Sequence, residues 1–176
     1  MKALTGKKIL SLLLSVLMCL SLMPLSAFAA GGTSNVAEIG NTKYATLGEA
    51  IAAAKDGDTV TLLANIKDTG KIILPANVTF DGAGKTLSGN SSISVNKAGG
   101  TVKNTVFKDI HDDTVVSDAN KKKYGFSDDK VGTLSAVYAP LISGKLVIEG
   151  CTFENIDWDA LQITPAEGAD ITIINN

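Results

Sequence analysis

Five polar and aromatic residues, gathered in two short segments, have the types and spacing that could do chemistry. They are His111, Asp113, Asp157, Trp158 and Asp159. Residues two apart on an extended strand point the same way, about 6.6 Å apart, and equivalent residues on neighbouring strands lie about 4.8 Å apart. If the two segments stack, His111 lies over Asp157 and Asp113 lies over Asp159. The spacing therefore predicts one polar patch.

Such a patch could serve several chemistries. Carboxylates this close repel each other, which favours protonation, solvation or a bridging cation such as calcium. A pair at this range could also act as acid and base in glycoside cleavage. An exposed indole beside carboxylates is a common sugar-stacking platform, although burial of Trp158 is an equal alternative. The simplest alternative is solvated corner residues. We expect a candidate glycan or calcium patch, and assign no catalytic residue and no definite metal ligand.

The two segments follow two copies of one phrase, at 105–110 and at 152–156. Each copy comes after a short β-branched run, and a returning strand-turn-strand phrase indicates a coiling chain. Comparable positions recur at nearly equal intervals, from Phe80 to Asn104 and from Ile148 to Ile173. This period is typical of a right-handed parallel β-helix, an all-β solenoid. Alternating apolar and polar residues agree with strands that have one face inside the coil.

The chain should begin the solenoid with a cap. Thr46 and Glu49 form a capping box before the helical run 50–54, and Gly57 can take a left-handed conformation beyond it. This is the one helix that the segment after the leader predicts. The expected strands lie at 36–39, 59–63, 71–74, 78–80, 93–95, 102–107, 136–138, 146–148, 161–163 and 171–174.

One interval breaks the period. The separation between Phe107 and Phe153 is close to two coils. The polar segment between them, about 111–134, holds few core-forming residues, so we expect it to be an inserted loop. Loops of this length usually serve a function.

The start of the chain, 1–29, predicts a secretory signal peptide. A basic start precedes a long apolar run, which ends at an Ala-x-Ala cleavage signature formed by Ala27 and Ala29. An uncleaved anchor is the alternative, but the cleavage signature favours removal. We expect a linker at 30–35 and a β-helix domain at 36–176, with a cap at 36–58 and rungs at 59–176. Since an apolar strand ends the sequence uncapped, we expect the N-terminal part of a longer protein.

Composition excludes some classes of function. After removal of the leader, 13 lysines and 18 acidic residues give a net charge of 13 − 18 = −5, and every basic residue is a lysine. Scattered lysines on an acidic chain do not form a nucleic-acid-binding stripe. Cys151 is the one cysteine beyond the leader, which excludes an intramolecular disulfide and predicts a small buried hydrophobe. We expect no membrane span in the mature chain.

Segments 44–51 and 57–62 together resemble the opening of pectin-lyase-fold proteins, and segment 146–155 resembles their rung consensus. The resemblance covers about 36–176 and implies a secreted bacterial right-handed β-helix. This group includes polysaccharide lyases and glycoside hydrolases acting on acidic glycans, as well as surface proteins without known activity. Pectate lyases of this fold depend on an arginine base and on aspartates that hold calcium. This chain has no arginine, which argues against an intact pectate-lyase site.

The sequence therefore predicts a secreted or cell-surface β-helix protein that engages extracellular polysaccharide, as part of a lyase or hydrolase or without cleaving it. We lean against activity in this segment, and calcium is the one cofactor considered. The alternative is a non-enzymatic adhesin or structural stalk that displays loops such as 111–134 to a cell-surface partner.

Overall fold

The computed structural model describes residues 34–112 and 134–176. The segment Asn35–Asn176 forms one compact unit. The expected signal peptide, 1–29, lies outside the described residues, as does the part 30–33 of the expected linker. Within the described ranges, no helix is both long enough and apolar enough to cross a membrane.

The unit begins with a hairpin and a short helix. Strand β1 (Ala37–Ile39) pairs antiparallel with β2 (Thr42–Tyr44) and with the first strand of the coil. Helix α2 (Leu47–Ala53) has the predicted capping box: the Glu49 N–H donates to Thr46 Oγ1 and the Thr46 N–H donates to Glu49 Oε2. These bonds satisfy two of the free donors at the helix start. Gly57 is left-handed, with φ of +82°, but it lies in a turn beyond the helix end at Ala54.

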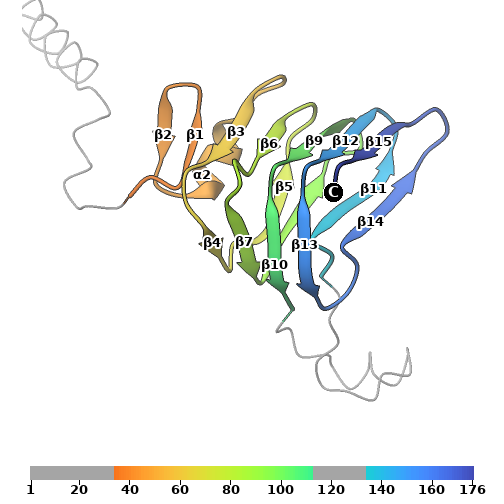
Figure 1. Cartoon of the computed structure of the whole chain (residues 1–176). Coiled ribbons are helices and arrows are strands. Elements are labelled where there is room, and N and C mark those ends of the chain that lie inside the picture. The colour runs from red at the N-terminus through yellow and green to blue at the C-terminus, as the bar shows by residue number, and fades with distance from the viewer. Residues whose placement is uncertain (1–33, 113–133) are drawn as a thin grey trace, which may run out of the picture. The chain divides into compact units, whose positions relative to one another are not determined.

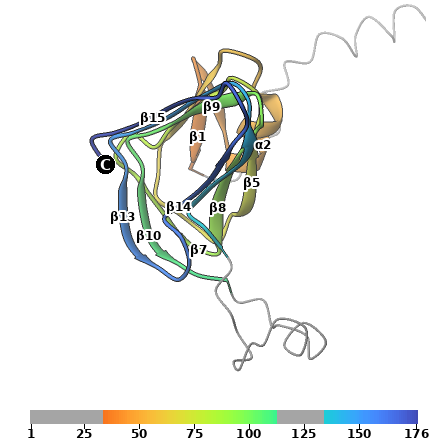
Figure 2. The ribbon, with the colours of Figure 1, turned by 90° about the vertical axis from the view of Figure 1, so that its right-hand side faces the viewer.

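After this cap the chain coils through three stacked sheets in turn (Figures 1 and 2). Sheet A contains β3 (Thr59–Leu62), β6 (Thr79–Asp81), β9 (Gly99–Lys103), β12 (Lys145–Glu149) and β15 (Asp170–Ile174). Sheet B contains β4 (Ile66–Lys67), β7 (Thr86–Gly89), β10 (Val106–Ile110) and β13 (Thr152–Ile156). Sheet C contains β5 (Gly70–Leu74), β8 (Ser91–Val95), β11 (Val137–Ile142) and β14 (Leu161–Pro165). These strands pair in parallel, which confirms the predicted β-solenoid with one short helix.

Apolar side chains from successive coils stack inside the solenoid. In sheet A, Val60, Phe80 and Val102 are in register and fully buried. In sheet B, the rings of Phe107 and Phe153 stack with centroids 5.2 Å apart and planes 3° apart. Removing these side chains from water stabilises the coil by about 25 cal/mol for each Å² of apolar surface.

The structure corrects the predicted strands at the corners. The expected strand 102–107 is two strands, β9 and β10, because Asn104 is left-handed (φ +49°) and turns the chain from sheet A into sheet B. Strands β4 and β7 were not predicted, since both are short and partly polar. Phe80 pairs with Val102 rather than with Asn104. The early coils are therefore shorter than the predicted period.

The long interval is confirmed by the register. Phe107 pairs with Phe153, a step of 153 − 107 = 46, whereas Val147 pairs with Thr172, a step of 172 − 147 = 25. The difference, 46 − 25 = 21, is the length of segment 113–133. That segment lies outside the described part of the chain, so the loop predicted there stays a prediction.

Candidate functional site

The two segments singled out in the sequence follow equivalent strands. Ile110 of β10 pairs with Ile156 of β13, and the Asp157 N–H donates to the Ile110 carbonyl over 3.0 Å. The residues that follow these strands, His111 and Asp157, therefore occupy equivalent positions on adjacent coils, as the stacking of the two phrases requires. Asp113, the other predicted member on this coil, lies outside the described residues.

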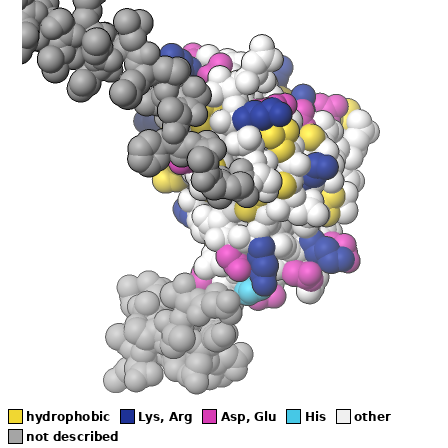
Figure 3. Space-filling model, turned by 90° about the vertical axis from the view of Figure 1, so that its left-hand side faces the viewer, with side chains coloured by type: hydrophobic (Ala, Val, Ile, Leu, Met, Phe, Trp, Pro, Cys, Tyr) yellow, Lys and Arg dark blue, Asp and Glu magenta, His cyan; other side chains and the backbone are white. Residues whose placement is uncertain are grey.

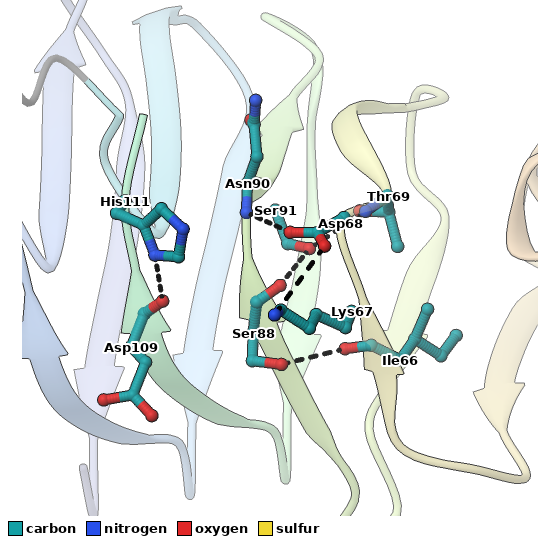
Figure 4. A network of polar contacts seen from close by, with 9 residues as sticks. All are labelled: Ile66, Lys67, Asp68, Thr69, Ser88, Asn90, Ser91, Asp109 and His111. Carbon is teal, nitrogen blue, oxygen red and sulfur yellow. Dashed lines mark hydrogen bonds and ion pairs between the residues drawn. The ribbon is translucent and has the colours of Figure 1, made fainter. Parts of the chain in front are cut away.

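Asp109 and Asn155 form the bend just before these segments. Both are left-handed, with φ of +51° and +54°, and Asn155 Nδ2 donates to Asp109 Oδ1 over 2.8 Å. These two side chains therefore bond each other across adjacent coils. The His111 Nδ1 atom lies 2.9 Å from the Asp109 carbonyl oxygen, and the Asp109 carboxylate points away from the imidazole (Figure 4).

The same bend on an earlier coil is also held by an aspartate. Asp68 is left-handed, and its Oδ1 atom accepts the Asn90 N–H over 2.9 Å (Figure 4). Gly89 lies against that carboxylate with φ of +66°, and a Cβ atom there would clash with Asp68 Oδ1. Asp68 and Asp109 thus fix the corner, which makes them structural residues rather than ligand-binding ones.

Asp157, Trp158 and Asp159 are all exposed at the turn that leads from β13 to β14. Trp158 is 49% exposed, so the indole is available to a ligand and the buried alternative is wrong. Among the described residues, no three His, Cys, Asp or Glu side chains lie close enough together to hold a metal ion. A calcium site that includes Asp113 stays a prediction.

A cavity that the sequence did not reveal lies on the outer face of sheet C. Its volume is about 240 Å³, and all four strands of the sheet or their flanking residues supply its lining: Lys71, Ser92, Leu134, Ser135, Tyr138 and Gln162. The lining is held by its own contacts. Ser92 Oγ donates to the Ser135 carbonyl over 2.6 Å, and Ser135 Oγ donates to Gln162 Oε1 over 3.2 Å. The Lys71 ammonium lies 4.6 Å from the centroid of the Tyr138 ring.

The cavity adjoins the exposed turn. The Ala136 N–H donates to the Asp159 carbonyl, and the Val137 N–H donates to the Ala160 carbonyl, both over 3.1 Å. Ala136 directly follows the cavity residue Ser135. The Trp158 turn is therefore hydrogen-bonded to the start of β11, next to the cavity residue Ser135, and the cavity together with this turn is named here the sheet C surface.

Sheet A offers a contrasting surface. A cavity of about 290 Å³ there is lined by Asn77, Gly100, Thr101, Lys145 and Val147, with no aromatic side chain. Beside it, Lys103 Nζ lies 3.2 Å from Asp81 Oδ2. Figure 3 views another face, the end of the unit that carries the N-terminal cap, and shows charged side chains of both signs along its lower edge. The cavity on sheet C is lined instead by the aromatic ring of Tyr138, with Lys71 as its one charged lining residue.

Cys151 is buried, as predicted, and is 2% exposed. Burial raises the pKa of its thiol and outweighs the hydrogen bonds with Thr105 and Glu149 that lower this pKa. A buried thiol with a raised pKa is a poor nucleophile. Cys151 therefore belongs to the core rather than to a site.

No family model, curated protein or solved structure matches this chain. The parallel solenoid is a property of the structure, whereas the pectin-lyase resemblance remains an interpretation of the sequence.

Proposed function

We propose that this chain is a secreted or cell-surface solenoid that binds an extracellular polysaccharide on the sheet C surface. The observation that carries the proposal is the cavity on sheet C, where Tyr138 and Gln162 stand beside each other on neighbouring strands. The signal peptide that the sequence predicts at 1–29 supports export of the chain.

The chemistry of this surface suits a sugar. Tyr138 and Trp158 present aromatic rings, which combine an apolar face with a polar edge. Beside Tyr138, the exposed Gln162 amide can exchange hydrogen bonds with sugar hydroxyls, and the buried Ser135 hydroxyl holds that amide by donating to its Oε1 atom. A few polar groups around an apolar surface is the usual composition of a ligand site.

The proposal is for binding without cleavage. None of the described residues that line the cavity is an aspartate or a glutamate, and Asp157 and Asp159 lie at the turn, outside the cavity lining, whereas glycoside hydrolysis generally uses a pair of carboxylates that flank the bond. The parallel coils also extend sheet C along the axis, at about 4.8 Å per strand. Such a surface suits an extended polymer better than a small molecule.

The proposal is tested by affinity electrophoresis of the processed chain through gels that contain neutral or acidic polysaccharides. Tyr138→Ala should weaken binding to the retained polymer about tenfold, because one aromatic contact and its hydrogen bond are lost. Gln162→Ala, at an exposed position, should weaken binding without disturbing the core.

Thr152→Ala is the matched control, since Thr152 is exposed on β13 of sheet B and lies outside the cavity. Binding should be unchanged in this variant. The proposal would be refuted if the Tyr138, Gln162 and Thr152 variants were all retained equally. It would also be refuted if circular dichroism showed the chain to be folded but no polysaccharide retained it.

A further inference from the structure

The outer face of sheet A carries a row of side chains of nearly the same shape. The residues that alternate with this row, such as Phe80, Val102 and Ile148, are fully buried, so the row points outward. All of its members are branched at Cβ. The register places one member on each of the five strands, and together they are named here the sheet A row: Thr59, Thr79, Thr101, Val147 and Thr172.

Charged side chains of opposite sign flank this row on β12. Lys145 precedes Val147 by two residues, Glu149 follows it by two, and both charged residues are exposed. Asp170 is in register with Lys145 on the next strand. Among the described residues, however, neither Lys145 nor Glu149 makes an ion pair. The strand therefore presents to solvent a positive charge, an apolar side chain and a negative charge, in that order.

This order of charges is complementary to itself. A second copy can lie face to face with the first, related by a twofold axis that runs along the sheet A row. Each strand then faces the same strand of the other copy in the opposite direction, so Lys145 faces Glu149 twice and Val147 faces Val147. A twofold interface requires such a pattern, because the same patch serves on both sides. Opposite charges that face each other fix the register of the two copies.

The neighbouring coils fit the same arrangement. The position equivalent to Lys145 on β9 is Gly99, and beside it lies the cavity of about 290 Å³ that Asn77 and Lys145 help to line. The twofold axis places Lys103 of the second copy opposite this cavity, which gives its long side chain room. It places Asp81 opposite Asn77, whose amide can donate to the carboxylate. On β6, β9 and β12, no two like charges therefore lie directly opposite each other.

Other occupants fit this face less well. The cavity has no aromatic lining residue on which a sugar could stack. Charges of both signs on each side of the row repel part of any polyanion or polycation. An even row of branched side chains packs instead against a second flat sheet, as in aligned sheet packing.

We propose that two copies of this chain associate through sheet A, with Lys145 of each copy paired with Glu149 of the other. This inference goes beyond the proposed function, because the interface includes no residue of the sheet C surface.

The size of the face makes this dimer weak. Five strands at about 4.8 Å each and about five residues at about 3.3 Å each give a face of about 400 Å² per copy. Stable interfaces bury about 800 Å² per partner. The dissociation constant should therefore be on the order of 0.1 mM. The chain is then a monomer at micromolar concentration, where unfolding is measured, and a dimer when it is concentrated.

The test is sedimentation equilibrium of the processed chain from micromolar to millimolar concentration. The parent chain should dimerise, and its dissociation constant should rise with salt, which screens exposed ion pairs. Lys145→Glu should raise that constant at least about tenfold, because like charges then face each other twice. Glu149→Lys should have the same effect. An equimolar mixture of the two variants should associate again, because each variant supplies the charges that the other lacks.

Lys67→Glu is the matched control, since it makes the same charge change at an exposed position of β4 in sheet B. This variant should dimerise like the parent. A parent chain that stays monomeric at every concentration would overturn the inference. Dimerisation of Lys145→Glu as tight as that of the parent would also overturn it, as would a mixture of the two variants, both folded by circular dichroism, that stays monomeric. Retention by polysaccharide gels is measured separately, so failure of the inference leaves the proposed function standing.

Discussion

At the scale of single residues, most polar side chains of known geometry in this solenoid stabilise corners. Asp81 shows how. Burial raises the pKa of its carboxyl, but the Ala83 N–H, the Asn104 amide and the Lys103 ammonium lower it more, so the pKa lies below its ordinary value of 3.8. A carboxylate with a lowered pKa in the folded state stabilises that state wherever it is ionised in both states.

The stabilisation by Asp81 should accordingly depend on pH. It is present above about pH 3.8, where the carboxyl of the unfolded chain is ionised, and is lost as the pH falls through the lower pKa of the folded chain. Asp81→Asn should reduce the free energy of unfolding by about 1 kcal/mol at pH 7. Its difference from the parent chain should shrink as the pH falls below 3.8, as measured by urea unfolding at several pH values.

Glu149→Gln serves as the control. Glu149 is exposed on the neighbouring coil, in β12, and its side chain has no ion pair in the described structure. That variant should unfold like the parent at every pH. A loss in Asp81→Asn that stayed constant down to pH 2 would contradict the role of its charge.

The role of a residue could be predicted from the sequence where its type and local sequence context indicate a single structural role. Cys151 and the capping pair Thr46 and Glu49 are examples. Tyr138 and Gln162 could not be found this way, because they are distant in sequence and meet only through the register of β11 and β14. The alternation of polar residues with inward Ile, Val and Leu indicated which side chains point outward. It did not indicate which of these residues lie next to each other on neighbouring strands.

At the scale of elements, the solenoid is stabilised by side chains that stack at equivalent positions of successive coils. Phe107 is fully buried between its neighbours, whereas Phe153, on the next coil, is only partly buried. Their rings contact each other, so each ring contributes to the burial of the other. A phenylalanine at this position therefore contributes a different amount to the free energy of unfolding on each of the two coils.

Phe107→Ala should lower the free energy of unfolding by about 3–5 kcal/mol, the usual cost of a large cavity in a core. Phe153→Ala should cost less, because part of its ring is already in water. Thr152→Ala, on the exposed face of the same strand, should change stability by no more than about 0.5 kcal/mol. Urea unfolding of the three variants gives the order, and a larger loss for Phe153→Ala than for Phe107→Ala would contradict the stacking model.

Most strands could be predicted from the sequence, because a repeated apolar segment is compatible with few folds. The returning phrase was confirmed by the register of Phe107 and Phe153. The boundaries were less predictable, since a left-handed residue such as Asn104 divides a run that is β-branched throughout most of its length. Strand β4 is very short and depends on pairing with β7, a long-range contact that its own sequence does not indicate.

At the scale of the whole unit, coiling turns sequence-distant residues into continuous surfaces. The three faces differ in character, although they are made by the same chain in turn. Sheets A and B carry paired charges, and the cavity on sheet C is lined by the Tyr138 ring, the Gln162 amide and the Lys71 ammonium. This difference between the faces is the reason for proposing a ligand-binding role for sheet C.

The most direct test of that role is hydrogen–deuterium exchange on the processed chain, with and without the polysaccharide that it retains best. Bound polymer should slow exchange of backbone amides in segments 134–138 and 160–162, which flank the sheet C cavity. The amides of β9 and β12 in sheet A should be unchanged. Protection of sheet A with no change at sheet C, under conditions where the polymer is bound, would contradict the account.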